Sequence, residues 1–102
     1  MAIGRSPKRK SLLHPGEVLR ERYMAPDALS ANALALALRV PATRISEIIR
    51  ERRGITADTA FRLSVYFETT AEMWMDLQKA YELAQVEHGS LAQIKKEVQR
   101  RA

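Results

Sequence analysis

The sequence predicts an all-α protein, and two observations carry that prediction. Apolar residues recur at helical spacing from residue 15 onward, with little of the alternation that indicates strands. Residues that favour helix starts stand at the beginning of these stretches, namely Pro15, Ser30, Thr56 and Thr70. We expect five helices, followed by a short sixth helix or an unstructured tail.

Length and composition are typical of a single soluble domain. The chain has 102 residues, of which 46% are hydrophobic and 28% charged. We divide it into a flexible basic arm over residues 1–13, a helical domain over 14–88 and a basic tail over 89–102. There is no cysteine, which excludes a disulfide scaffold, a thiolate nucleophile and a Cys-ligated metal.

The first two helices have clear boundaries in the sequence. Pro15 suits the first position of a helix, and we expect Pro26 to end that helix. Ser30 can cap the second helix over residues 31–38, a segment rich in strong helix formers. Its alanines allow another helix to approach closely.

The third helix is expected over about Ala42 to Arg50, after a break at residues 39–41 in which Pro41 suits a new helix start. At about 100° per residue, its large apolar side chains fall on one side. These are Ile45, Ile48 and Ile49. The other side carries small, polar and basic residues, and Gly54 closes the loop that follows.

Capping residues and apolar spacing predict three further helices. Thr56 can cap a fourth helix, whose buried stripe would consist of Ala60, Leu63, Ser64 and Phe67. Thr70 can cap a fifth, which His88-Gly89 would end. The segment Ser90 to Gln93 fits a capping box for a sixth, short helix. We expect this last helix to need a partner surface for stability.

The second and third helices, joined by a short break, form a helix-turn-helix candidate. A core-anchored helix with a polar outer face can enter the major groove of DNA. An ordinary amphipathic helix with a solvated face is the alternative. The Ala-rich preceding helix and the basic loop that follows favour DNA binding. The candidate DNA-contacting residues are Asn32, Ala42, Thr43, Arg44, Ser46, Glu47, Arg50, Arg52 and Arg53.

The charge distribution supports a polyanionic partner. The net charge is +5, which in a small domain favours nucleic acid or an anionic membrane surface. The longest apolar run, Ala33 to Leu38, is far too short to span a membrane. No hydrophobic signal region follows the basic N-terminus. We therefore expect a cytoplasmic protein that binds double-stranded DNA and no membrane.

The sequence contains no pattern typical of an enzyme. It has no GxSxG, no phosphate loop and no HExxH, so we expect neither catalysis nor a metal or cofactor. Several large apolar residues near the C-terminus are interpreted as core or dimer interface, two alternatives that the sequence leaves open. They are Trp74, Leu77, Tyr81, Leu91 and Ile94.

Five stretches within residues 14–88 resemble the HigA-type antitoxins, in the Xre group of lambda-repressor-like proteins. They are His14 to Leu19, Ser30 to Ala35, Arg44 to Ile48, Arg53 to Ala60 and Met73 to Leu83. The resemblance implies a five-helix domain that forms a homodimer, largely through its C-terminal region. It also implies binding to a palindromic operator in its own promoter, and tight neutralisation of a RelE-like mRNA interferase toxin.

The chain departs from the family pattern at several positions. Arg39 and Glu51 stand where the family commonly has Gly, and a side chain there would be strained if φ is positive. Ala31 replaces a usual Gln, and Leu36 replaces a usual polar residue. Two alternatives to the antitoxin therefore stay open: a stand-alone repressor without a toxin, and a protein-interaction module with weakened DNA binding.

Overall fold

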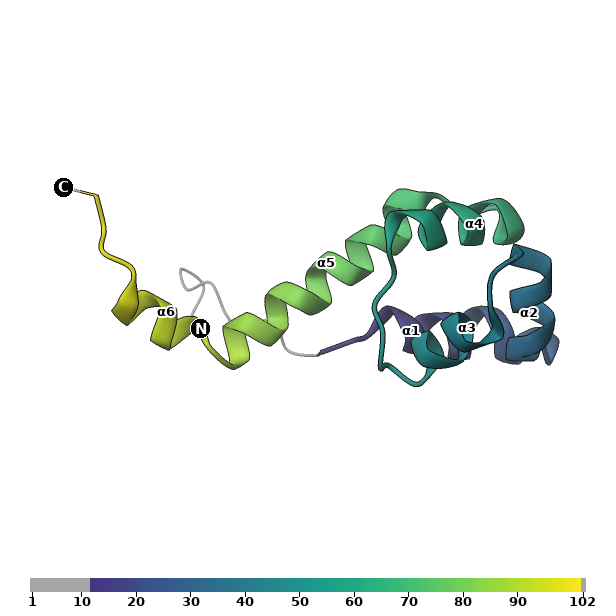
Figure 1. Ribbon diagram of the computed structural model, residues 1–102, viewed down its shortest axis with the longest axis horizontal. Helices are drawn as coiled ribbons and strands as arrows, with labels where there is room; N and C mark the ends of the chain where they lie inside the picture. Colours follow the sequence, from purple (N-terminus) through teal and green to yellow (C-terminus); the bar gives the residue numbers. More distant parts are fainter. Residues whose placement is uncertain (1–11, 102) are drawn as a thin grey trace, which may run out of the picture.

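The computed structural model describes residues 12–101, and all regular structure in that range is helical, as the sequence predicts. The α-helices are α1 (Pro15–Val18), α2 (Ala31–Leu38), α3 (Ala42–Ile49), α4 (Ala57–Phe67), α5 (Ala71–His88) and α6 (Leu91–Glu97). Helices α1 to α4 gather with the start of α5 into one packed body. The rest of α5 extends away from this body and carries α6 at its far end (Figure 1).

The first helical region is less regular than the sequence predicts. After α1 the backbone widens into a π-helical segment over Leu19–Met24 and then tightens into a 3₁₀ turn over Ala25–Asp27. Pro26 therefore does not end the helix. It lies at the start of the 3₁₀ turn, where its missing N–H is not needed. The chain leaves the turn at Ala28, in the left-handed region with φ 51°.

Most of the expected basic arm lies outside the described residues. Its last two residues are described: Leu12 is exposed, whereas Leu13 packs against the core. Leu13 therefore contributes to the packing of the helical body, directly before the predicted domain start at residue 14.

Helices α2 and α3 form the predicted helix-turn-helix. The Ser30 hydroxyl accepts a hydrogen bond from the Ala33 N–H at 3.0 Å, which caps α2 and contributes about 1 kcal/mol. Arg39 ends α2 with φ 61°, and Glu51 follows α3 with φ 63°. These are the two positions where the resemblance placed Gly, and a left-handed residue with a side chain costs about 1–2 kcal/mol.

The fourth and fifth helices start at the predicted caps. Thr56 Oγ1 accepts from the Thr59 N–H at 3.4 Å, and Thr70 Oγ1 accepts from the Met73 N–H at 3.1 Å. Of the expected stripe on α4, Ala60 and Leu63 are wholly buried. The remaining two residues of that stripe are half-buried.

The sixth helix forms, but without the predicted capping box. Ser90 makes no side-chain capping bond, because its backbone, with ψ 0°, lacks the extended geometry of a cap. Gln93 donates forward to the Glu97 carboxylate at 2.9 Å instead of reaching back. Apart from Leu91, which is half-buried, the residues of α6 are exposed.

Two general properties of residues 12–101 bear on function. No helix in this range is both long and apolar enough to cross a membrane. Nor does the same range bring three or more His, Asp or Glu side chains together where they could hold a metal ion.

Candidate nucleic-acid interface

Helix α3 is anchored by its apolar side and presents its polar side outward. Ile45 and Ile48 are wholly buried, and Ile49 packs against the core at its edge. Ala42 and Thr43 on the opposite side are exposed. A helix held in this way offers its outer face to a groove without loss of core packing.

Eight of the nine predicted DNA-contacting residues lie on α3 or on the loop between α3 and α4, and Asn32 lies in the first turn of α2. Six of the nine are exposed, namely Asn32, Ala42, Thr43, Arg50, Arg52 and Arg53. The other three are half-buried, namely Arg44, Ser46 and Glu47.

The four arginines of this surface fall into two pairs. Arg44 and Arg53 are bound by carboxylates of the same chain, Arg44 to Asp58 at 3.0 Å and Arg53 to Glu47 at 2.7 Å. Arg50 and Arg52 make no side-chain hydrogen bond or ion pair within residues 12–101. The second pair is therefore available to an external anion without breaking an internal bond.

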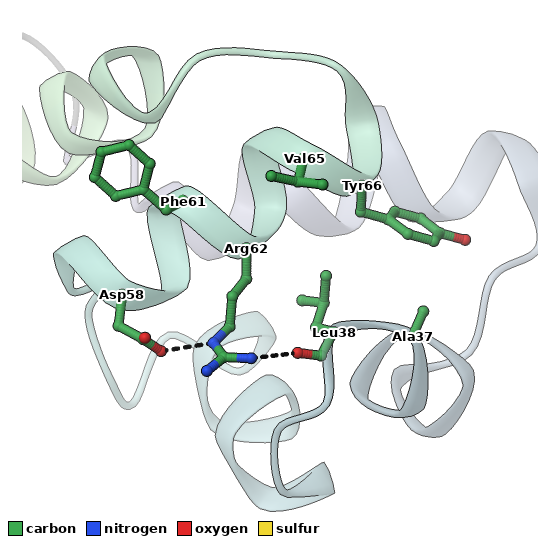
Figure 2. A pocket seen from close by; sticks show the side chains of 7 residues that line it. All are labelled: Ala37, Leu38, Asp58, Phe61, Arg62, Val65 and Tyr66. Atoms are coloured by element: carbon green, nitrogen blue, oxygen red, sulfur yellow. Dashed lines mark hydrogen bonds and ion pairs between the residues drawn. The ribbon is translucent and has the colours of Figure 1, made fainter.

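Asp58 belongs to this surface, although it is not among the DNA-contacting residues predicted from the sequence. Its Oδ2 accepts from Arg44 Nη1 at 3.0 Å and from Arg62 Nε at 2.8 Å. Arg62 Nη1 also donates to the Leu38 carbonyl at 2.8 Å, in the last turn of α2 (Figure 2). The i,i+4 spacing of Asp58 and Arg62 is visible in the sequence, whereas the contact with Arg44 depends on tertiary structure.

Charge and hydrogen bonding keep the Asp58 carboxylate ionised. The hydrogen bond from Arg62 contributes most to lowering the pKa of Asp58, and the charges of Arg62 and Arg44 add to it, against a smaller opposing effect of desolvation. At neutral pH the cluster is therefore one carboxylate between two guanidinium groups.

Glu51 is also compensated within the chain. Its carboxylate lies 3.6 Å from Arg20 Nη2, and Arg20 Nη1 donates to the Ile49 carbonyl at the end of α3. Arg20 thereby ties the first helical region to the C-terminal end of α3. The negative charge that replaces a usual Gly at residue 51 is offset by an internal cation.

A buried glutamine fixes the loop between α3 and α4. Gln78 of α5 accepts from the Ile55 N–H at 2.8 Å and donates to Glu82 at 2.7 Å. Gly54 packs against the same amide, since a Cβ at Gly54 would lie 2.6 Å from Gln78 Nε2. The loop segment 52–53 with its two arginines is thus held at its C-terminal side. Nothing in the sequence singles out Gln78, a polar residue on the side of α5 that also carries Trp74 and Tyr81.

An open hollow of about 400 Å³ lies between α2 and α4. Figure 2 shows the Asp58–Arg62 ion pair beside apolar side chains from both helices. Phe61 and Val65 of α4 are 62% and 80% exposed there, and Leu36 of α2 is 76% exposed. Of these three residues, only Leu36 was noted from the sequence, as the replacement of a usual polar residue.

The residues interpreted as core or dimer interface differ in how deeply they are buried. Trp74 is wholly buried in the core of its own chain, and its Nε1–H donates to Thr69 Oγ1 at 2.9 Å. Leu77 and Tyr81 are half-buried on the same helix. Leu91 is also half-buried, whereas Ile94 is 38% exposed.

A helix-turn-helix on a small helical bundle, with a polar outer face on its second helix and three arginines directly after it, defines a helix-turn-helix transcriptional regulator. No protein-family model matches the chain. Virulence-associated protein I of Dichelobacter nodosus is 52% identical over 87 residues, which cover 85% of this chain and 81% of that protein. The uncharacterised HTH-type transcriptional regulator YbaQ of Escherichia coli K12 is 38% identical over 79 residues, covering 78% of this chain and 70% of YbaQ.

Solved structures identify the family more closely. The Pseudomonas aeruginosa antitoxin HigA, in a structure with the higBA promoter, is 42% identical with a TM-score of 0.84, covering 90% of this chain and all of that one. The antitoxin GraA, in complex with its operator, is 40% identical with a TM-score of 0.86, covering 96% of this chain and 99% of that one.

The chain belongs to the HigA-type antitoxins, which confirms the resemblance drawn from its five sequence stretches. The relatives above for which a function is stated are antitoxins and transcriptional regulators. This agrees with the prediction that the protein is not an enzyme.

Proposed function

We propose that the protein is an antitoxin and autorepressor, which binds a palindromic operator in its own promoter as a homodimer and neutralises a RelE-like toxin. The observation that carries DNA binding is the exposed polar face of α3, with Arg50 and Arg52 unpaired within residues 12–101. Two similar structures support it, since they contain HigA with the higBA promoter and GraA in complex with its operator.

We assign the contacts by the chemistry of each side chain. Arg50 would read guanine or clamp a phosphate, and Thr43 would touch a thymine methyl or a phosphate. Arg52 and Arg53, in the loop, suit the phosphate backbone. Glu47 would accept from a cytosine amino group, and its ion pair with Arg53 at 2.7 Å would orient it.

The distal part of the chain is the proposed dimer interface. Several apolar side chains stay exposed along the second half of α5 and on and after α6. They are Leu83 at 44%, Val86 at 38%, Ile94 at 38% and Val98 at 63%. A two-fold pairing there would cover them, and the reading of two half-sites requires two copies of α3 about 34 Å apart, one turn of DNA. Leu83→Ser with Ile94→Ser should then lower the mass of the particle in light scattering to that of one chain.

We further propose that the partner protein is a ribosome-dependent toxin. The expected compartment of the antitoxin is the cytoplasm, where both promoter DNA and such a toxin are found. Support comes from the similar structures, which include the antitoxins HigA and GraA and an addiction-module antidote protein of the HigA family. Co-expression with the product of a neighbouring RelE-like gene should relieve growth arrest and give a stable complex. If no such gene adjoins, the stand-alone repressor gains support.

A mobility shift on the DNA upstream of the gene tests operator binding, with an unrelated duplex as competitor and two salt concentrations. Specific binding that weakens with salt is expected, with a log–log slope of about −5 if roughly six phosphates are contacted. Arg50→Ala should weaken binding by about 1–3 kcal/mol, and Lys79→Ala, on exposed α5 surface, serves as the control. Equal retention of both duplexes would refute an operator function.

A further inference from the structure

We propose that Asp58 is a positioning residue for DNA recognition: its carboxylate holds the Arg44 guanidinium so that the remaining N–H groups bind an operator phosphate. This inference rests on the operator binding proposed above. It gives Asp58, an acidic residue beside a DNA-binding surface, a role that raises operator affinity rather than lowering it.

The carboxylate is itself held in place from behind. Arg62 Nε donates to Asp58 Oδ2 at 2.8 Å, and Arg62 Nη1 donates to the Leu38 carbonyl at 2.8 Å. Arg44 joins the same Oδ2 at 3.0 Å. These hydrogen bonds connect the first turn of α3, the first turn of α4 and the end of α2 through the Asp58 carboxylate. Figure 2 shows the bonds from Asp58 through Arg62 to Leu38.

Arg44 keeps the capacity to bind a phosphate while bound to Asp58. A guanidinium has five N–H donors, and the bond to Asp58 uses one of them. The Arg44 side chain is 29% exposed. It lines a hollow of about 210 Å³ together with Arg53 and Gly54, at the junction of α3, the basic loop and α4. The guanidinium groups of Arg44 and Arg53 therefore border one open space, and the Asp58 carboxylate lies on its wall.

Holding Arg44 in advance should strengthen binding. A free arginine loses much rotational freedom when it is fixed on a ligand, and one that is already held loses less. The opposing effect is simple repulsion, because a carboxylate near DNA disfavours the phosphates. The two effects predict opposite results when Asp58 is replaced, so the sign of the change decides between them.

The test is a double-mutant cycle on the full chain, with the upstream operator duplex and an unrelated duplex. Asp58→Ala should weaken operator binding about tenfold, which corresponds to about 1.4 kcal/mol. Arg44→Ala should weaken it to a similar extent. In the Arg44→Ala background, Asp58→Ala should cause no further weakening, because its effect acts through Arg44.

Three further variants make the result specific. Asp58→Asn keeps an acceptor oxygen and should retain operator affinity within about threefold, about 0.7 kcal/mol. Asp58→Ser suits a first helical turn but is too short to reach Arg44, and it replaces the alanine variant if that one fails to fold. Asp76→Ala removes an equivalent carboxylate, paired with Lys79 at 3.6 Å on α5, and should change nothing. Melting temperatures exclude general unfolding.

Two outcomes would overturn the proposal. If Asp58→Ala and Asp58→Ser bind the operator as tightly as the parent or more tightly, repulsion dominates and Asp58 does not position Arg44. If Asp58→Ala weakens binding equally in the Arg44→Ala background, it acts through Arg62 and the α2 end instead. Failure of the unsubstituted protein to prefer its operator would refute the proposed function itself, and is seen before any variant is made.

Discussion

Gly16 of α1 lies directly against the backbone carbonyl of Ile48 in α3. A Cβ placed on Gly16 would stand 1.8 Å from that oxygen and 2.7 Å from its carbon. Gly16 is therefore required for the close approach of the two helices, and not for a left-handed backbone, since no described glycine has positive φ. This contact sets how deeply α3 is seated in the core, and hence how far its polar face projects.

Replacing Gly16 with Ala should destabilise the protein by about 3 kcal/mol or more, because the neighbouring backbone cannot yield without moving a helix. Urea unfolding measures the change. Gly89→Ala is the control, since its added Cβ would lie 3.0 Å from the Gln85 carbonyl oxygen, a contact that a small shift relieves, and we expect a change of about 1 kcal/mol or less. A loss no larger than that of the control would contradict the role given to Gly16.

His14 should make stability depend on pH. Its ring is buried, and Nδ1 accepts a hydrogen bond from the Gly16 N–H at 2.9 Å, which requires an unprotonated nitrogen. Burial lowers the pKa of His14 below its ordinary value of 6.5, with Glu51 opposing and Arg20 adding to the shift. The stabilisation is therefore present above the unfolded-state pKa and is lost as pH falls through the folded-state value.

Urea unfolding at pH 7.5 and 5.5 should show lower stability at the acidic value. His14→Asn retains a capping side chain without a titrating ring, so its stability should change less over the same interval. Asn is smaller and loses the ring contact with Tyr81, at 4.7 Å between centroids, so the pH-dependence is the readout and not the absolute stability. An unchanged pH-dependence in His14→Asn would assign the effect to another group.

Gln78→Ala should destabilise the protein by about 1–3 kcal/mol, because it leaves the buried Ile55 N–H without its acceptor. Since Gln78 also anchors the loop that carries Arg52 and Arg53, operator binding should weaken together with stability. Thermal unfolding and the mobility shift measure the two effects. Gln93→Ala removes an exposed amide bound to Glu97 and is expected to be neutral.

Glu68→Gly should stabilise the protein by about 0.5–1 kcal/mol. Glu68 ends α4 with φ 57°, where a side chain is strained, and Gly relieves that strain at a smaller cost in unfolded-state entropy. Glu72→Gly, in the first turn of α5, should instead destabilise by about 1 kcal/mol. The melting temperature should rise in Glu68→Gly and fall in Glu72→Gly. A lower melting temperature in both variants would show that the left-handed conformation at residue 68 carries no strain.

The elements predicted correctly are those defined by neighbouring residues. Ser30, Thr56 and Thr70 each cap a helix as predicted, because a cap needs only a hydroxyl and the N–H three residues later. The error at Ser90 is also local: the capping-box pattern is present, but Ser90 has ψ 0° and lacks the extended backbone that a cap needs. The π-helical widening after α1 has no local pattern that predicts it.

In the candidate interface, too, the features set by neighbouring residues were predicted, and those that depend on distant residues were not. The buried side of α3, with Ile45 and Ile48, and its polar outer side follow from a period of 3.6 residues. The sequence could not show that Arg44 is bound by Asp58, fourteen residues further on, or that Arg50 and Arg52 stay unpaired.

The sequence by itself determined the helical class, the helix-turn-helix, the family and the division of α3 into a buried and an outer side, because periodicity and capping act over one or two turns. Only the tertiary structure decided which residues meet across the fold. Gly16 against Ile48, Gln78 on Ile55 and Asp58 between two arginines all join segments whose separation in space depends on the packing of the whole core. Close packing and hydrogen-bond geometry act over a few ångströms, and nothing in the local sequence encodes those distances.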